Sequence, residues 1–163
     1  MFKYLFKRGG FTLIEIIIAM SIFATLSGII TINLLHAQSK TSLDTSVASI
    51  LADIKGQQTL AMSGSIQGGT SASEYGIYFG TTSYTIFSGS SYSANNSTNF
   101  VIPLKNNVNF SSVTFPSRVI IFQRASGEIA NFNSAQNQIT LSNQGGENKT
   151  ITLNGIGVIS SVQ

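Results

Sequence analysis

The stretch Arg8-Gly9-Gly10-Phe11-Thr12-Leu13-Ile14-Glu15 joins a short basic leader to an apolar run that reaches Leu35. Glu15 is out of place in such a run, because a charged side chain at bilayer depth costs roughly 2.5–3.5 kcal/mol on insertion scales. Acids at such positions are candidates for a function. This junction therefore bears on both the fold and the function.

Each part of the junction has two interpretations. Gly9-Gly10 suits a flexible joint before a helix, because glycine is conformationally permissive and a poor helix former. The same extended backbone also suits the cleft of a protease. Glu15 favours the positive end of a helix dipole or reaches back to the lipid headgroups. In the alternative interpretation, the Glu15 carboxylate pairs with a positive charge on another molecule.

The run from Phe11 to Leu35 is long enough to cross a membrane. At about 1.5 Å per residue it covers roughly 37 Å, against a hydrocarbon core of about 30 Å. Basic residues that flank a hydrophobic helix stay in the cytoplasm, and here these are Lys3, Lys7 and Arg8. We therefore expect a single pass through the cytoplasmic membrane, with the C-terminal part outside.

The junction resembles the class III signal of type IV pilins and of the pseudopilins of type II secretion. This resemblance implies a leader over residues 1–10 that a prepilin peptidase removes by cutting after Gly10. It also implies that the new N-terminal residue, Phe11, is N-methylated. Glu15 would then guide assembly with other pilin subunits by pairing with the Phe11 amine of a neighbour.

The apolar run departs from the usual pilin pattern at one point. Mature pilins commonly carry a proline in the middle of this segment, and this chain has none there. Gly28 is the weak position instead, because glycine costs up to about 1 kcal/mol relative to alanine in a helix. We expect the helix to bend or fray near Gly28 when the subunit leaves the bilayer.

Charge and composition argue against several classes of function. Of the nine basic residues three lie in the leader, so six remain after Gly10 and balance the six acids. A nucleic-acid partner is therefore not favoured, although it stays open. With no cysteine, and with His36 as the single histidine, we expect no enzyme, no cofactor and no metal site.

After the apolar run, residues 36–62 continue a helical pattern that is apolar on one face. The pattern predicts one helix from Phe11 to Met62 that ends at Ser63-Gly64, with its second half packed on a globular domain. The residues that form this face are Leu43, Val47, Ile50, Leu51, Ile54, Leu60 and Ala61.

Residues 63–163 change to the alternation typical of strands. A turn-rich connector, Gly64 to Ser73, precedes a predicted hairpin of Tyr75–Phe79 and Tyr84–Ile86, and Ser88–Asn99 forms a polar loop. We expect six or seven short strands, drawn from eight candidate segments, in a small antiparallel sheet, hence an α+β fold. The remaining candidate strands are Val101–Leu104 and Val108–Val113 at sheet edges, Val119–Phe122 buried on both faces, Ile139–Leu141, Lys149–Leu153 and Val158–Val162.

The C-terminal half adds a second, weaker resemblance. The segments Phe122–Glu128, Lys149–Leu153 and Gly155–Ile159 look like the corresponding part of H-type pseudopilins and related minor pilins. The resemblance implies a structural subunit of a type IV pilus or of a type II secretion pseudopilus.

Two other functions remain open. One is a tip module that binds DNA, a surface or secreted cargo, for which the Ser88–Asn99 loop is a candidate contact. Arg118, Arg124 and Lys149 are too sparse to predict a DNA-binding stripe. The other is an anchored protein that is never cleaved, for which Gly9, Gly10 and Glu15 would be coincidental.

Overall fold

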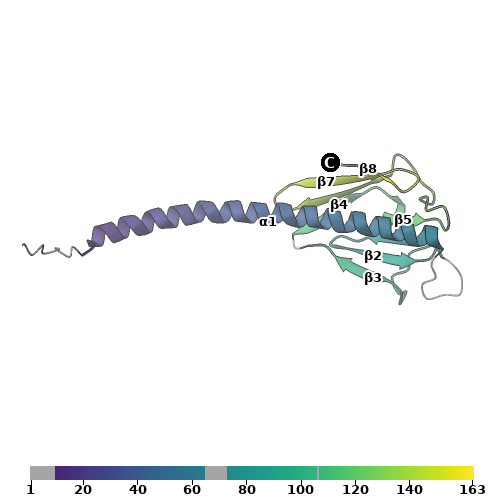
Figure 1. The fold of residues 1–163 in the computed structure, drawn as a ribbon, viewed down its shortest axis with the longest axis horizontal. Coiled ribbons are helices and arrows are strands. Elements are labelled where there is room, and N and C mark those ends of the chain that lie inside the picture. Colours follow the sequence, from purple (N-terminus) through teal and green to yellow (C-terminus); the bar gives the residue numbers. More distant parts are fainter. Residues whose placement is uncertain (1–9, 65–72, 106) are drawn as a thin grey trace, which may run out of the picture. The chain divides into compact units, whose positions relative to one another are not determined.

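The computed structural model describes residues 10–64, 73–105 and 107–163, apart from the side chains at positions 32, 33, 35 and 36. The predictions for Lys3, Lys7, Arg8 and Gly9, for the side chain of His36 and for most of the Gly64–Ser73 connector lie outside this part. The chain divides into two compact units, Met1–Ala37 and Gln38–Gln163. Helix α1 (Leu13–Ser63) contributes to both (Figure 1).

In the first unit α1 is apolar and uncovered. Its segment Leu13–Thr31 is long and apolar enough to cross a membrane, and none of it is buried within the chain. The hydroxyl groups here donate to carbonyls of their own helix: Ser21 to Ile17, Thr25 to Ile22, and Thr31 to Ser27. These polar side chains therefore need no water, which suits an apolar surrounding.

Helix α1 is continuous through Gly28. A methyl group added at this glycine would meet nothing within 4 Å. No close packing within the described part of the chain therefore requires a glycine here, and the expected bending outside the bilayer stays a prediction.

In the second unit α1 is covered by its own chain. The predicted apolar face is confirmed, since Leu43, Val47, Ile50, Ile54 and Ala61 are buried and Leu51 and Leu60 pack at its border. The helix ends at Ser63, where Gly64 adopts a left-handed φ of 64° and donates to the Ala61 carbonyl at 3.4 Å. Glycine is the residue that takes this conformation at a helix end without steric cost.

The strands form two antiparallel sheets. The first has the order β3-β2-β1-β5, built from β1 (Tyr75–Phe79), β2 (Ser83–Ser88), β3 (Phe100–Pro103) and β5 (Val119–Phe122). The second has the order β4-β6-β7-β8, built from β4 (Val108–Val113), β6 (Gln138–Asn143), β7 (Asn148–Leu153) and β8 (Ile159–Val162). A short 3₁₀ turn, η1 (Pro116–Arg118), precedes β5.

The α+β class is confirmed, but the expected single sheet of six or seven strands is wrong. The described residues form eight strands in two sheets, and Figure 1 shows β2 and β3 on one side of this half of α1 and β7 and β8 on the other. Inner faces of both sheets contribute to one core with the helix. Local alternation predicts strands but not which of them pair, and this is why the second sheet was missed.

Strand β5 is not buried on both faces as its four consecutive apolar residues predict. It is an edge strand that pairs with β1, and only Ile120 and Phe122 are buried. Val119 and Ile121 are half-buried on the other face. The segment after β5 turns back along it, so that the Ala130 N–H donates to the Ile121 carbonyl at 2.8 Å.

The C-terminal end of α1 is fastened to two loops by one buried side chain. The Gln58 amide donates to the carbonyls of Gly127 at 3.0 Å and Ile156 at 2.7 Å, while its own oxygen accepts from Lys55 at 3.2 Å. A side chain at Gly157 has no room, since its Cβ would lie 2.5 Å from the Gln58 nitrogen. The Gln58 amide thus joins the helix end to both loops, and the Ala125 N–H adds a backbone bond to the Ala61 carbonyl at 3.0 Å.

A second polar contact joins the middle of this helical half to β2. The Tyr84 hydroxyl donates to the Asp53 carboxylate. Burial of the phenol, followed by the hydrogen bond and the negative charge of Asp53, raises the pKa of Tyr84 above its ordinary value of 10.0. The contact therefore stabilises the folded chain while the phenol keeps its proton.

This contact gives a pH-dependent prediction. Because the folded pKa is raised, the contribution of Tyr84 is fully present below about pH 10 and declines at higher pH, where the unfolded chain releases the proton first. Replacement Tyr84→Phe lowers the free energy of unfolding by about 1–2 kcal/mol near neutral pH and removes this part of the alkaline decline. Thermal unfolding of the full chain in detergent, followed by circular dichroism across pH, measures both effects.

The matched control is Tyr78→Phe. The Tyr78 hydroxyl makes no hydrogen bond to the described part of the chain, and its ring stacks on Tyr92. We expect a smaller loss of stability and an unchanged alkaline decline for this variant. Equal pH profiles for Tyr84→Phe and Tyr78→Phe would contradict the role of the Tyr84–Asp53 contact.

Candidate processing and assembly site

Gly10 and Phe11, which flank the predicted cut, lie outside regular structure. Gly10 is exposed and precedes α1, and Phe11 is 85% exposed. A Cβ built on Gly10 would meet nothing within 4 Å. No close packing within the described part of the chain therefore requires a glycine at this position, which leaves recognition by another molecule as a reason for it.

Thr12 and Glu15 form a capping box at the start of α1. The Thr12 N–H and the Thr12 hydroxyl both donate to Glu15 Oε2 at 2.8 Å, and the Glu15 N–H donates to Thr12 Oγ1 at 3.3 Å. The Thr12 carbonyl accepts from the Ile16 N–H at 3.3 Å. Such reciprocal bonds satisfy backbone donors that a helix start otherwise leaves unpaired.

Glu15 was predicted as a site residue, but its partner within the chain, Thr12, was not. Its signal was present, because Thr12-Leu13-Ile14-Glu15 has the threonine and acid at the spacing of a capping box. The structure places Glu15 next to Thr12, at the start of α1 and close in sequence to Phe11. These hydrogen bonds therefore fix the orientation of the Glu15 carboxylate.

The surroundings of Glu15 are apolar. With Phe11, it lines a shallow groove whose other lining residues are Ile16, Ala19, Met20 and Phe23. Between Gly10 and Ala37, Glu15 is the only residue that carries a charge when His36 is neutral. An ion pair for this carboxylate therefore requires a cation from elsewhere, or the α-amine that cleavage after Gly10 would create.

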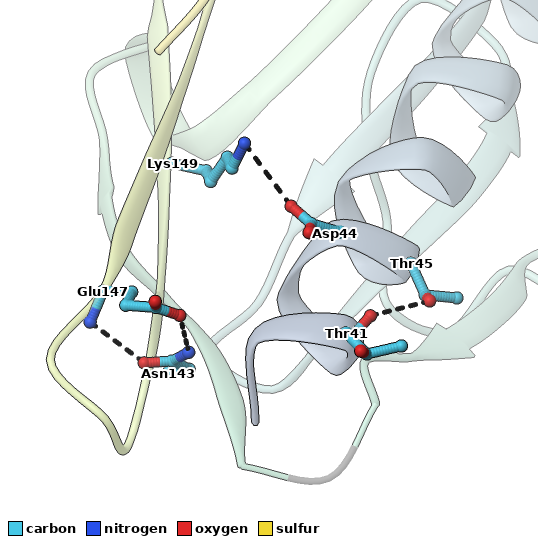
Figure 2. A network of polar contacts seen from close by, with 6 residues as sticks. All are labelled: Thr41, Asp44, Thr45, Asn143, Glu147 and Lys149. Atoms are coloured by element: carbon cyan, nitrogen blue, oxygen red, sulfur yellow. Dashed lines mark hydrogen bonds and ion pairs between the residues drawn. The ribbon is translucent and has the colours of Figure 1, made fainter. Parts of the chain in front are cut away.

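The basic residues considered for nucleic-acid binding are partly engaged within the chain. Arg118 donates from Nε to the Phe79 carbonyl at 2.7 Å and from Nη2 to the Gly80 carbonyl at 2.6 Å. Lys149 on β7 lies 3.4 Å from Asp44 on α1, as Figure 2 shows. Of the described residues, no three of His, Cys, Asp or Glu are grouped so that they could hold a metal ion.

Figure 2 also shows how the turn beside this ion pair is closed. The Asn143 amide donates to Glu147 Oε2 at 2.9 Å, and the Glu147 N–H donates back to Asn143 Oδ1 at 3.0 Å. Glu147 therefore serves the β6–β7 turn.

Comparison with known proteins gives one match. Residues 5–31 match the model of the prokaryotic N-terminal methylation motif, which covers 27 of the 163 residues (5 to 31 inclusive). No curated protein and no solved structure matches the chain. The match includes Gly9, Gly10, Phe11 and Glu15, and it supports a type IV pilin-like protein with a class III signal.

The capping box gives a prediction about the helix start. Replacement Thr12→Val removes the hydroxyl that bonds Glu15, and loss of an N-cap of this kind costs about 0.5–2 kcal/mol. The backbone amides of the first turn should then exchange with solvent roughly 2- to 30-fold faster in detergent micelles. Amide hydrogen exchange followed by NMR measures this directly.

The control is Thr25→Val, in the same helix. The Thr25 hydroxyl donates to the Ile22 carbonyl at 2.8 Å and takes no part in the cap. We expect this variant to leave exchange in the first turn unchanged. If both variants gave the same first-turn rates, the capping role of Thr12 would be wrong.

Proposed function

We propose that this protein is a structural subunit, a minor pilin or pseudopilin, of a type IV pilus or a type II secretion pseudopilus. A prepilin peptidase cuts the chain after Gly10, and the new N-terminal Phe11 is methylated. The observation that carries the proposal is the match over residues 5–31, within which Glu15 is a single charge on an uncovered apolar helix.

The first unit is suited to storage in the cytoplasmic membrane. Large apolar side chains between Leu13 and Thr31 are exposed, and the hydroxyl groups Ser21, Thr25 and Thr31 are satisfied by the helix itself. Lys3, Lys7 and Arg8 keep the leader in the cytoplasm. The domain of residues 63–163 is then exported and reaches the filament as its outer part.

Pairing between subunits follows from the charge on Glu15. Cleavage gives Phe11 a free amine, which is a cation at the helix start after methylation as well. An unpaired charge in an apolar surrounding is strongly penalised, whereas a paired one regains much of that cost. Glu15 of one subunit and the Phe11 amine of its neighbour would therefore favour one axial register over others.

The capping box lowers the ordering cost of this pairing, because it orients the Glu15 carboxylate in advance. Thr12 engages only Oε2 of Glu15 in the bonds described above, so Oε1 stays available to a neighbour's amine. The carboxylate is also held at the end of the helix on which the amine appears. The carboxylate therefore does not have to change its orientation when subunits meet.

A role restricted to the secretion pseudopilus rests on the weaker resemblance. The segments that resemble H-type pseudopilins include the two loops that Gln58 fastens to the end of α1. The need to hold the end of α1 explains the likeness of these loops at least as well as membership of the same secretion system does. Pilus and pseudopilus both remain within the proposal.

Processing is tested by the intact mass of the membrane-extracted protein, expressed with and without a prepilin peptidase. We expect loss of residues 1–10 together with the addition of one methyl group, only when the peptidase is present. A Gly10→Leu variant should keep its leader under both conditions. An unprocessed N-terminus beside an active peptidase would refute the proposed cleavage.

Assembly is tested separately with Glu15→Gln. Glutamine suits this position of a capping box, so the helix start is preserved while the negative charge is removed. We expect normal membrane insertion and cleavage, with incorporation into sheared filaments reduced roughly tenfold or more because the ion pair is lost.

The control for assembly is Glu128→Gln, which removes an exposed acid from the second unit. This variant should enter filaments as the wild type does. Normal incorporation of Glu15→Gln would contradict the pairing of Glu15 with Phe11, and it would leave the cleavage result unaffected.

A further inference from the structure

The second unit contains a cavity that the assembly function does not use. It has a volume of about 360 Å³ and lies beside β5, whose outer edge bridges the segment around Ile129. Three segments form its walls together with Ile121: residues 90–92, residues 115–117 with 119, and residues 129–133 with 136. Its size is that of a ligand pocket and exceeds the space of a single water.

One wall comes from the polar loop Ser88–Asn99, which the sequence predicts as a candidate contact for a partner. The loop is fixed here by Tyr92, whose ring stacks on Tyr78 with centroids 4.2 Å apart and an interplanar angle of 4°. The same ring also contacts Phe87, at a centroid distance of 5.5 Å. Ser90 and Ser91 are therefore presented from an anchored segment.

The floor and the rim of the cavity differ in chemistry. Its floor includes the buried Phe115 and Ile129 and the half-buried Ile121. Apart from Pro116, its exposed rim consists of hydroxyl and amide side chains, of which Ser117 and Asn131 have left-handed backbones with φ of 52° and 53°. Within the described part of the chain, neither side chain has a hydrogen-bond partner that would compete with a ligand.

No residue among the described lining carries a charge. Arg118 is next to the rim in sequence, but its guanidinium is bound to the carbonyls of Phe79 and Gly80. Phosphates, nucleic acids and acidic polymers therefore find no counter-charge here. An added peptide strand is disfavoured as well, because the outer edge of β5 is already occupied: the Ile121 carbonyl accepts from Ala130, and Phe122 bridges Ile129.

The geometry points to a binding site for a neutral carbohydrate. A sugar ring has an apolar C–H face that matches the floor, and hydroxyl groups that both donate and accept hydrogen bonds. Serine hydroxyls and carboxamides also do both, which neither ammonium groups nor carboxylates can. The cavity accommodates a mono- or disaccharide unit, and binding does not depend on filament assembly.

The experiment is a glycan array probed with the full chain in a zwitterionic detergent, since detergents with sugar headgroups would compete. Neutral and anionic oligosaccharides are compared, and ligands that bind are titrated by calorimetry. The test variant is Ser117→Gly with Asn131→Gly, which removes two rim side chains while glycine keeps both left-handed backbones. Asn107→Gly is the matched control, because Asn107 has a φ of 68° and does not line the cavity.

We expect neutral glycans to bind, with affinity reduced at least about fivefold in the double variant and unchanged in Asn107→Gly. If the double variant failed to fold, Gln136→Ala on the exposed rim should give a loss in the same direction. The proposal would be overturned by binding of anionic glycans alone, by no binding of neutral glycans, or by equal affinities of wild type and cavity variants.

Discussion

The structure depends on how helix α1 is covered along its length. Its part in the second unit buries Leu43, Ile50 and Ile54 against two sheets, whereas the segment Leu13–Thr31 has no cover from its own chain. Burial of one large apolar side chain is worth roughly 1.5–3 kcal/mol, so an uncovered segment of this length must be covered from outside. Lipid tails and neighbouring helices are equally apolar, and a subunit that passes from one to the other need not lose this stabilisation.

Glu15 is tolerable in that segment because it serves the helix start. Backbone N–H groups at the beginning of a helix have no partner within the helix, and hydrocarbon offers none. The reciprocal bonds between Thr12 and Glu15 satisfy part of this need at 2.8 to 3.3 Å. The negative charge that remains is then the feature that calls for a cation, so a single side chain both completes the helix and creates a demand for a partner.

The sequence predicted what depends on neighbouring residues. Helical spacing identified the buried face from Leu43 to Ala61, and alternation placed most strands within a residue or two. Contacts between distant residues were missed, such as Tyr84 with Asp53 and Gln58 with Ile156, because no local pattern marks a partner 31 or 98 positions away. The expected burial of β5 on both faces was wrong for a related reason: segments far away in the chain decide what covers a strand's second face, and Val119 and Ile121 stay half-buried. At the candidate site, the spacing of Thr12 and Glu15 could have predicted the capping box, although it was not predicted. The cavity could not be predicted in this way, because its lining comes from three separate segments and no one of them has a recognisable pattern.

The second unit separates the two proposed roles. Gln58 fastens the end of α1 to the turns at Gly127 and Ile156, and the Ile129 N–H, at the start of the cavity wall, donates to the Gly155 carbonyl at 2.9 Å. The wall of the cavity therefore starts from the same fixed turns that hold the helix end. The rim residues Ser117 and Asn131, however, make no hydrogen bond to the described part of the helix, so they can change without altering the helix or its junction. Substitution at the rim should thus alter what the second unit binds and leave processing and assembly intact, whereas substitution at Glu15 should impair assembly and leave processing and binding at the cavity intact.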